Sequence, residues 1–263
     1  MPIDPVQAVR CRRGLLVSVE GISGVGKTFL TNRLQTATTD DQQGADPRVV
    51  IIEAFSRRLR GSSPKVGHRI LSALVTEAKG DRFLRAGYPR SETLLLLAVK
   101  MHDYESCLLP LQQGRLVLEG RSLHSVAVYQ SLILHPEGPP QALAEAREIL
   151  ELAGQWRPLP DLTILLIDDV TAAIRRAEQR DNKRFTDEEW RMHHQAAALF
   201  EQLAAADPDR CRVIDRRHAD TASVLNQITA WIDSLQEHLP CATLPWQIDS
   251  VDEFVSCHDH CRL

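Results

Sequence analysis

The chain has 263 residues, of which 43% are hydrophobic and 25% are charged, and its formal net charge is −4. The slight negative charge provides no general attraction to nucleic acid polymers or anionic membranes. No run approaches the roughly 18 consecutive apolar residues of a membrane-spanning helix, and Met1 to Pro5 lacks the charged and apolar regions of a signal peptide. Six scattered cysteines favour free thiols in a reducing compartment. These features predict a cytoplasmic protein.

The first apolar run, Leu16 to Glu20, leads directly into Gly21-Ile22-Ser23-Gly24-Val25-Gly26-Lys27-Thr28. This is the phosphate-loop pattern G-x-x-x-x-G-K-T, and a helix-compatible segment follows it at once. The glycines let consecutive N–H groups converge on phosphate oxygens at a helix N-terminus. Lys27 adds positive charge for the β- and γ-phosphates, and the Thr28 hydroxyl can ligate Mg²⁺. The motif predicts that these residues bind ATP with Mg²⁺.

Further apolar runs alternate with helical patterns along the chain. The strand candidates are Leu15 to Glu20, Val49 to Ala54, Leu116 to Glu119, Leu162 to Ile167 and Arg212 to Asp215. Their continuous apolar character is typical of strands covered on both faces. The predicted fold is therefore α/β, a three-layer P-loop NTPase fold with a five-stranded parallel sheet wrapped by helices.

Apolar residues at helical spacing predict the intervening helices. The candidates lie around Val66 to Val75, Glu92 to Leu109, Leu143 to Ala153, Thr186 to Ala206 and Thr221 to Leu235. The polar stretch Thr36 to Pro47 is predicted to be a loop.

The chain after the last predicted helix contains Cys257-His258-Asp259-His260-Cys261. Cysteine and histidine so close together could bind Zn²⁺, but the C-x₃-C spacing is not a usual zinc pattern. A tail of uncertain order is the favoured interpretation.

The third predicted strand ends in Glu119-Gly120-Arg121-Ser122. Because the carboxyl ends of parallel strands border the ligand crevice, Glu119 and Arg121 are predicted to face the phosphates. A structural ion pair at the strand end is the alternative interpretation.

The order and spacing of these motifs resemble the thymidylate kinase family over about residues 14 to 235. The family's strand-end Asp-Arg-Tyr and its later Ala-Tyr-Gln correspond to Gly120-Arg121-Ser122 and Val128-Tyr129-Gln130. Pro160-Asp161-Leu162-Thr163 opens strand four, and Glu92-Thr93-Leu94-Leu95 opens the helix that borders the acceptor in that family. The resemblance implies a homodimeric nucleoside monophosphate kinase that transfers the ATP γ-phosphoryl group to dTMP or a similar nucleotide.

Several positions depart from the family pattern. Gly120 replaces the family's Asp, and Glu119 is the predicted substitute for handling Mg²⁺ or its waters. Leu96 replaces the aromatic residue that stacks on thymine, and Lys100 replaces the Arg that follows it. The acceptor is therefore less firmly predicted than ATP.

The remaining predicted acceptor residues follow from the same resemblance. Tyr129 is expected to crowd the 2′ position and Gln130 to lie near the base, with Ser125 one helical turn before Tyr129 on the same face. The family's Arg-Glu-Pro after strand two is reduced to Glu53-Ala54-Phe55, where Phe55 could restore stacking on the base.

A cationic segment follows strand four, where the family has its mobile lid. It contains Arg175, Arg176, Arg180, Lys183 and Arg184. Arg176 and Arg180 would share one helix face, and Arg184 would extend that row if the helix continued. The segment is predicted to bring positive charge onto the phosphates, the alternative being a solvated charged helix. The expected organisation is a leader (1–13), a kinase domain (14–238) with a lid at about 175–187, and a tail (239–263).

Two other functions stay open from the sequence. Deoxynucleoside kinases have a strand-three Glu-Arg-Ser, approximated here by Glu119-Gly120-Arg121-Ser122, and a Glu after strand two, where Glu53 stands, to take a proton from a sugar hydroxyl. The glycine at position 120 also allows a nucleotide-binding protein without transferase activity.

Overall fold

The computed structural model describes residues 13–38, 49–52 and 66–238. Its parallel sheet has the order β2-β3-β1-β4-β5. The strands are β1 (Leu16–Glu20), β2 (Val49–Ile52), β3 (Leu116–Gly120), β4 (Leu162–Ile167) and β5 (Cys211–Asp215). All residues of β1 are buried, as expected for a central strand covered on both faces. The predicted fold is confirmed.

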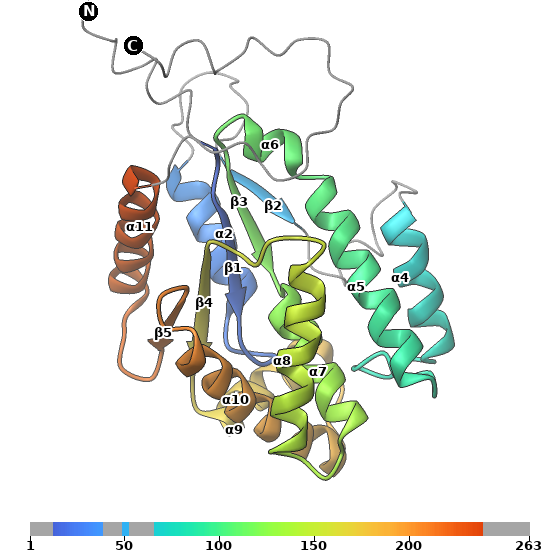
Figure 1. Cartoon of the computed structure of the whole chain (residues 1–263). Helices are drawn as coiled ribbons and strands as arrows, with labels where there is room; N and C mark the ends of the chain where they lie inside the picture. The colour runs from blue at the N-terminus through green and yellow to red at the C-terminus, as the bar shows by residue number, and fades with distance from the viewer. Residues whose placement is uncertain (1–12, 39–48, 53–65, 239–263) are drawn as a thin grey trace, which may run out of the picture.

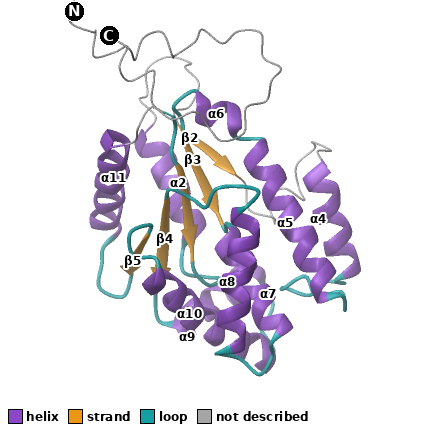
Figure 2. Cartoon of the chain, in the orientation of Figure 1, coloured by secondary structure: helices purple, strands orange, loops and turns teal. Residues whose placement is uncertain are grey.

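Helices enclose the sheet on both faces (Figures 1 and 2). They are α2 (Lys27–Thr38), α4 (Val66–Glu77), α5 (Pro89–Glu105), α6 (Leu108–Gln112), α7 (Leu123–Leu134), α8 (Gln141–Gly154), α9 (Val170–Asp181), α10 (Asp187–Ala206) and α11 (Thr221–His238). Helix α2 packs against β1 to β3 and contacts α11, whereas α7, α8 and α10 pack together on the opposite face. This arrangement gives the three layers.

The predicted helix from Glu92 to Leu109 is divided in the structure. Helix α5 begins earlier, at Pro89, where the Glu92 carboxylate accepts hydrogen bonds from the backbone N–H groups of Ala86 and Tyr88. It ends at Glu105, and α6 follows as a separate short helix. Pro110 explains the break, because proline has no N–H to donate and its ring clashes with the carbonyl four residues earlier.

Helix boundaries elsewhere follow local capping. Thr186 and Glu189 form a reciprocal capping box that starts α10, which confirms the predicted start of that helix within one residue. Helix α2 continues to Thr38, so the first residues of the loop predicted from Thr36 are helical, and residues 39–48 lie outside the described part of the chain.

Candidate active site

The phosphate loop joins β1 to α2: residues 21–26 lie between the central strand and the helix, and Lys27 and Thr28 form the N-terminus of α2. Gly24 and Gly26 have φ angles of 86° and 96°, which L side chains rarely adopt. A Cβ at Gly24 would lie 1.8 Å from the Ala173 carbonyl oxygen of α9. The loop therefore requires glycine both for its turns and for its close approach to α9.

Lys27 folds back over this loop. Its ammonium donates to the carbonyl oxygens of Gly21 at 2.6 Å and Ile22 at 2.7 Å. Burial, followed by the nearby Arg121 guanidinium, holds the pKa of Lys27 well below its usual value, although Glu20 opposes the shift. A negatively charged phosphate at this loop would compensate for the burial of the ammonium.

Arg121 lies where the end of β3 meets the phosphate loop, as predicted from the strand order. Its Nη2 donates to Ser23 Oγ at 2.8 Å, and its guanidinium carbon lies 5.7 Å from the centre of the Tyr129 ring. One side chain thus contacts both the predicted ATP site and the predicted acceptor site. The backbone of Arg121 has a φ of 76°, a left-handed conformation that is uncommon for a residue with a Cβ.

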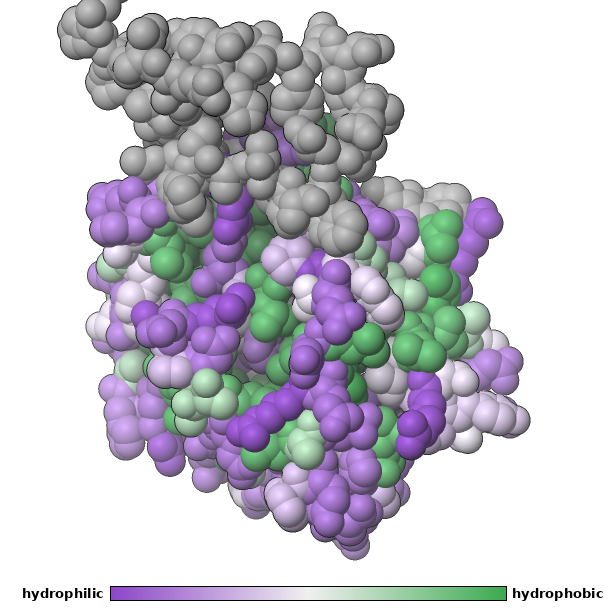
Figure 3. Space-filling model, in the orientation of Figure 1, coloured by the Kyte–Doolittle hydropathy of each residue, from purple (hydrophilic) through white to green (hydrophobic). Residues whose placement is uncertain are grey.

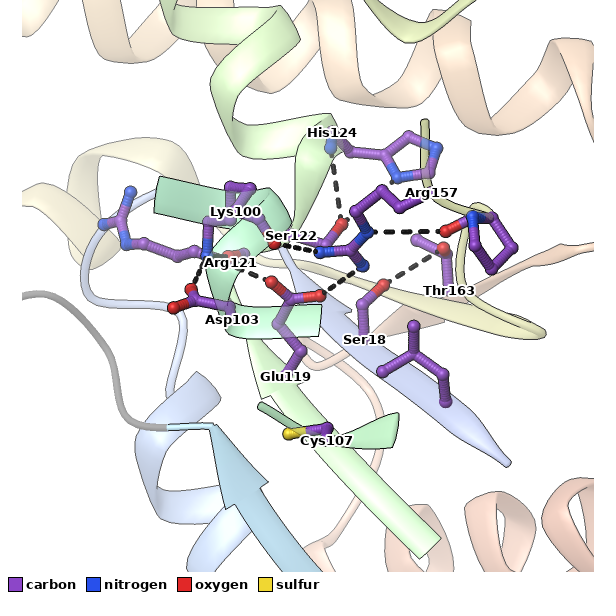
Figure 4. A network of polar contacts seen from close by, with 12 residues as sticks. Ser18, Lys100, Asp103, Cys107, Glu119, Arg121, Ser122, His124, Arg157 and Thr163 are labelled. Atoms are coloured by element: carbon purple, nitrogen blue, oxygen red, sulfur yellow. Dashed lines mark hydrogen bonds and ion pairs between the residues drawn. The ribbon is translucent and has the colours of Figure 1, made fainter. Parts of the chain in front are cut away.

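Glu119 does not face the phosphates, and the prediction that it handles Mg²⁺ is wrong. Its carboxylate is fully buried between Lys100, at 3.1 Å, and Arg157, at 3.0 Å (Figure 4). Burial alone would raise the pKa of Glu119, but Arg157 and Lys100 together hold it below its usual value. Because side chains alternate along a strand, Glu119 points away from the face to which position 120 belongs. The structural ion pair, which the sequence left as an alternative, is the correct interpretation.

Lys100 and Leu96 are also not exposed to an acceptor. Lys100 is 2% exposed and belongs to the same ion cluster as Glu119. Leu96 is buried in the main hydrophobic core. Their predicted roles beside the base are therefore corrected to core packing and ion pairing.

The predicted acceptor residues on α7 are brought together but heavily buried. Ser125 Oγ donates to Glu20 Oε2 at 2.6 Å, and Gln130 Oε1 accepts from Thr93 Oγ1 at 3.0 Å. The Tyr129 ring is stacked with Phe83, at 5.5 Å between ring centres. The sequence interpretation missed Phe83, which precedes α5 and packs its ring against the predicted acceptor residue Tyr129.

His193 on α10 is a further residue that the sequence interpretation missed. Its ring is 2% exposed and lies 5.4 Å from Phe83 and 5.0 Å from Phe185, edge to face. Neither ring nitrogen has a hydrogen-bond partner within the described residues. Burial, followed by the charges of Arg121 and Lys27, lowers the pKa of His193 to about 3. The ring is therefore neutral beside the phosphate loop.

Two more charged residues at the ends of strands contact the site. Glu20 accepts from the backbone N–H and the hydroxyl of Ser122, which ties the turn after β3 to β1. Arg216, directly after β5, donates to the Val25 carbonyl oxygen of the phosphate loop. Their positions at the carboxyl ends of parallel strands are the sequence signal that could have identified them.

The arginines of the predicted lid occupy two different settings. Arg176 Nε donates to the Gly24 carbonyl oxygen at 3.0 Å, and Arg180 pairs with Asp181 at 2.7 Å. Helix α9 ends at Asp181, because Asn182 adopts a left-handed conformation with φ of 48°. Because the helix does not continue, the condition for extending the row is not met, and Arg184 is not part of the row formed by Arg176 and Arg180.

Glu53, Phe55 and the Cys257 to Cys261 segment lie outside the described residues. Among the residues that are described, no group of histidine, cysteine and carboxylate side chains could hold a metal ion by itself, and none of the helices is long and apolar enough to cross a membrane.

The parallel sheet, the phosphate loop and the converging cations define an ATP-dependent phosphotransferase of the P-loop class. The family model for thymidylate kinase matches residues 19–228. A thymidylate kinase of Dinoroseobacter shibae is 33% identical over 215 residues, covering 80% of this chain and 93% of its own, and one of Clavibacter sepedonicus is 33% identical over 205 residues, covering 77% and 87%. The chain belongs to the thymidylate kinase family.

Solved structures agree on the fold. A Candida albicans thymidylate kinase superposes with a TM-score of 0.59 at 18% identity, covering 86% of this chain and 94% of its own. An Ehrlichia chaffeensis thymidylate kinase gives a TM-score of 0.55 at 18% identity, covering 84% and 99%.

Proposed function

We propose that this protein transfers the γ-phosphoryl group of ATP to dTMP. The observation that carries the proposal is the position of Arg121, whose guanidinium contacts Ser23 of the phosphate loop and lies over the Tyr129 ring. Phosphoryl transfer requires positive charge between donor and acceptor. Arg121 supplies that charge at the junction of the two sites.

The residues around the phosphate loop have different proposed roles in binding and transfer. Lys27 and the backbone N–H groups from Gly21 to Gly26 bind the donor phosphates. Arg176, already bonded to Gly24, and Arg180, close enough to Lys27 to lower its pKa, add charge from the lid. Phe83 and Tyr129 offer the aromatic surface beside the acceptor.

Mg²⁺ belongs to this proposal. The exposed Thr28 hydroxyl, in the first turn of α2, is the protein oxygen that would hold it, with ATP oxygens and water completing the shell. The ion would neutralise phosphate charge during transfer. With Glu119 excluded and Gly120 lacking a side chain, β3 provides no carboxylate to assist.

We also propose a homodimer in the cytoplasm, with residues 14–238 as the kinase domain and about 175–187 as its lid. Hydrophobic residues are visible at the surface over α4 and α5 in Figure 3, and Val66, Leu94 and Leu95 are 62%, 55% and 40% exposed there. Such a face suits association. The buried free thiols of Cys107 and Cys211 suit a reducing compartment. Light scattering on purified protein tests the dimer.

A coupled ADP-release screen across nucleosides and nucleoside monophosphates tests the function. ADP formation with dTMP, abolished by Lys27→Ala in a folded variant, is the expected result. Turnover with thymidine alone would establish a nucleoside kinase instead, and ATP binding without turnover on any acceptor would establish a binding protein.

A further inference from the structure

The turn that carries Arg121 is held at several points. The Arg121 N–H donates to the Val19 carbonyl oxygen at 3.3 Å, and the next N–H, that of Ser122, donates to Glu20 Oε1. The Arg121 carbonyl oxygen accepts a hydrogen bond from the Lys100 ammonium. A left-handed residue with a Cβ costs about 1–3 kcal/mol and persists only where its surroundings fix it. Hydrogen bonds to both the N–H and the carbonyl oxygen of Arg121 therefore hold its backbone in this conformation.

Lys100 itself is fixed by a buried cluster of charges (Figure 4). Its ammonium lies 3.1 Å from Glu119 and 3.6 Å from Asp103. Arg157 completes the cluster, because it donates to Glu119 Oε2 at 3.0 Å and to the Lys100 carbonyl oxygen at 3.0 Å. The cations and anions balance, so none of them is left as an isolated buried charge.

The cluster connects distant parts of the sequence. Lys100 and Asp103 belong to α5, Glu119 to β3, and Arg157 to the segment between α8 and β4. The Lys100 side chain is aimed away from solvent and toward the backbone of the Arg121 turn (Figure 4). Since a buried ion cluster adds little to stability over apolar packing, its geometric effect on Arg121 is the more informative consequence.

We propose that Lys100 is a positioning residue for Arg121, acting through the backbone of the turn after β3 and making no contact with the acceptor base. Glu119 orients the ammonium, and the ammonium bonds the Arg121 carbonyl oxygen. The left-handed turn then directs the guanidinium toward Ser23 and Tyr129. The inference rests on the proposed function, because it assigns how that site's central arginine is held.

The test removes the ammonium without leaving an unbalanced charge. Lys100→Met combined with Asp103→Asn deletes one cation and one anion, and it keeps the Glu119–Arg157 pair. Asp103→Asn alone is the matched control, because it retains the bonds from Lys100 to Glu119 and Arg121. We expect kcat/KM to fall about tenfold between the control and the combined variant.

A double-mutant cycle then asks whether Lys100 acts through Arg121. In an Arg121→Ala background, the same pair of variants should differ by less than about twofold, because the guanidinium to be positioned is gone. A loss of about tenfold in both backgrounds would overturn the proposal, since Lys100 would then act on the acceptor or on the whole fold.

Two further measurements keep the result interpretable. If circular dichroism shows that the combined variant does not fold, Lys100→Arg replaces it, because this substitution keeps the buried charge but alters its geometry. Lys100→Arg is then compared in the wild-type and Arg121→Ala backgrounds, and the two outcomes above are interpreted in the same way. The wild-type rate with dTMP tests the proposed function separately. The cycle is also repeated on the dissociation constant of Mg-ATP, measured by calorimetry, because Arg121 bonds the phosphate loop whichever acceptor is used.

Discussion

The guanidinium of Arg82 lies over the ring of Phe185, with its central carbon 4.0 Å from the ring centre. Arg82 also pairs with Asp181 at 2.6 Å and with Glu189 at 3.4 Å. Arg82 comes from the segment between α4 and α5, whereas Asp181 ends α9, Glu189 lies in the first turn of α10, and Phe185 lies between these two helices. Arg82 thus links the segment before α5 to the region where α9 ends and α10 begins, which includes most of the proposed lid.

Arg82→Ala should loosen the lid. A cation–π contact and partly exposed ion pairs together contribute about 1–2 kcal/mol, so local opening around residues 181–189 should become about tenfold more frequent. Hydrogen exchange measured by mass spectrometry checks this. Arg175→Ala, which alters an exposed lid arginine, is the control, and equal exchange in both variants would contradict the anchoring role.

ATP binding should be coupled to proton uptake by Lys27. Burial and Arg121 lower the pKa of its ammonium in the free protein, and bound phosphates raise it again. At a pH between the Lys27 pKa of the free protein and that of the ATP complex, ATP binding therefore takes up a proton. The affinity for ATP falls as the pH rises through this range. Calorimetry in buffers of different ionisation enthalpy measures the uptake. Lys27→Arg, which stays charged, should bind ATP without it.

His193 should make the fold sensitive to acid. Its pKa is about 3 in the folded protein and ordinarily 6.5, so below pH 6.5 the unfolded chain binds a proton that the folded protein does not. Stability is therefore lost as pH falls from 6.5 toward 3. Between pH 7 and pH 5 this group accounts for about 2 kcal/mol of unfolding free energy. Urea denaturation at both pH values measures the unfolding free energy. The decrease from pH 7 to pH 5 should be smaller in His193→Phe than in the wild type by this amount.

Gly120→Asp should be accommodated and should strengthen the use of Mg²⁺. A Cβ at Gly120 would have no heavy atom within 4 Å, and the side chain would lie on the face opposite that of Glu119. The added carboxylate would give β3 the ligand it lacks, lowering the Mg²⁺ concentration for half-maximal activity by about tenfold. Gly120→Ala separates the effect of the Cβ from that of the carboxylate, and an equal change in both variants would reject the explanation.

The lid arginines should differ in importance. Arg176 bonds the phosphate loop through Gly24, whereas Arg184 follows the end of α9 and is exposed. Arg176→Ala should lower kcat about a hundredfold, as expected for loss of a placed donor to a developing anion. Arg184→Ala should have a clearly smaller effect in the same steady-state assay, and the reverse order would show that the lid rearranges during turnover.

Much of the fold could be predicted because its signals are local. Strands buried on both faces are continuously apolar, and a phosphate loop is a contiguous motif, so β4 is found at the predicted residues. Pro110 shows where prediction from helical spacing fails. The apolar periodicity predicts one helix from Glu92 to Leu109, but the missing N–H of the proline divides this segment into two helices. The rule that parallel strand ends border the ligand crevice placed Arg121 correctly beside the loop but misplaced Glu119, and the family resemblance misplaced Lys100.

The sequence by itself determined the phosphate loop, the order in which the strand segments follow one another along the chain, and the family. Each of these can be recognised from short motifs of neighbouring residues and their order. Only the tertiary structure decided which way side chains point at the strand ends. Lys100, Glu119 and Arg157 are far apart along the chain, and their mutual attraction in the buried interior overrides the site roles predicted for Lys100 and Glu119. A buried charged side chain pairs with an opposite charge that is close to it in the folded structure, and the order of residues along the chain does not specify that partner.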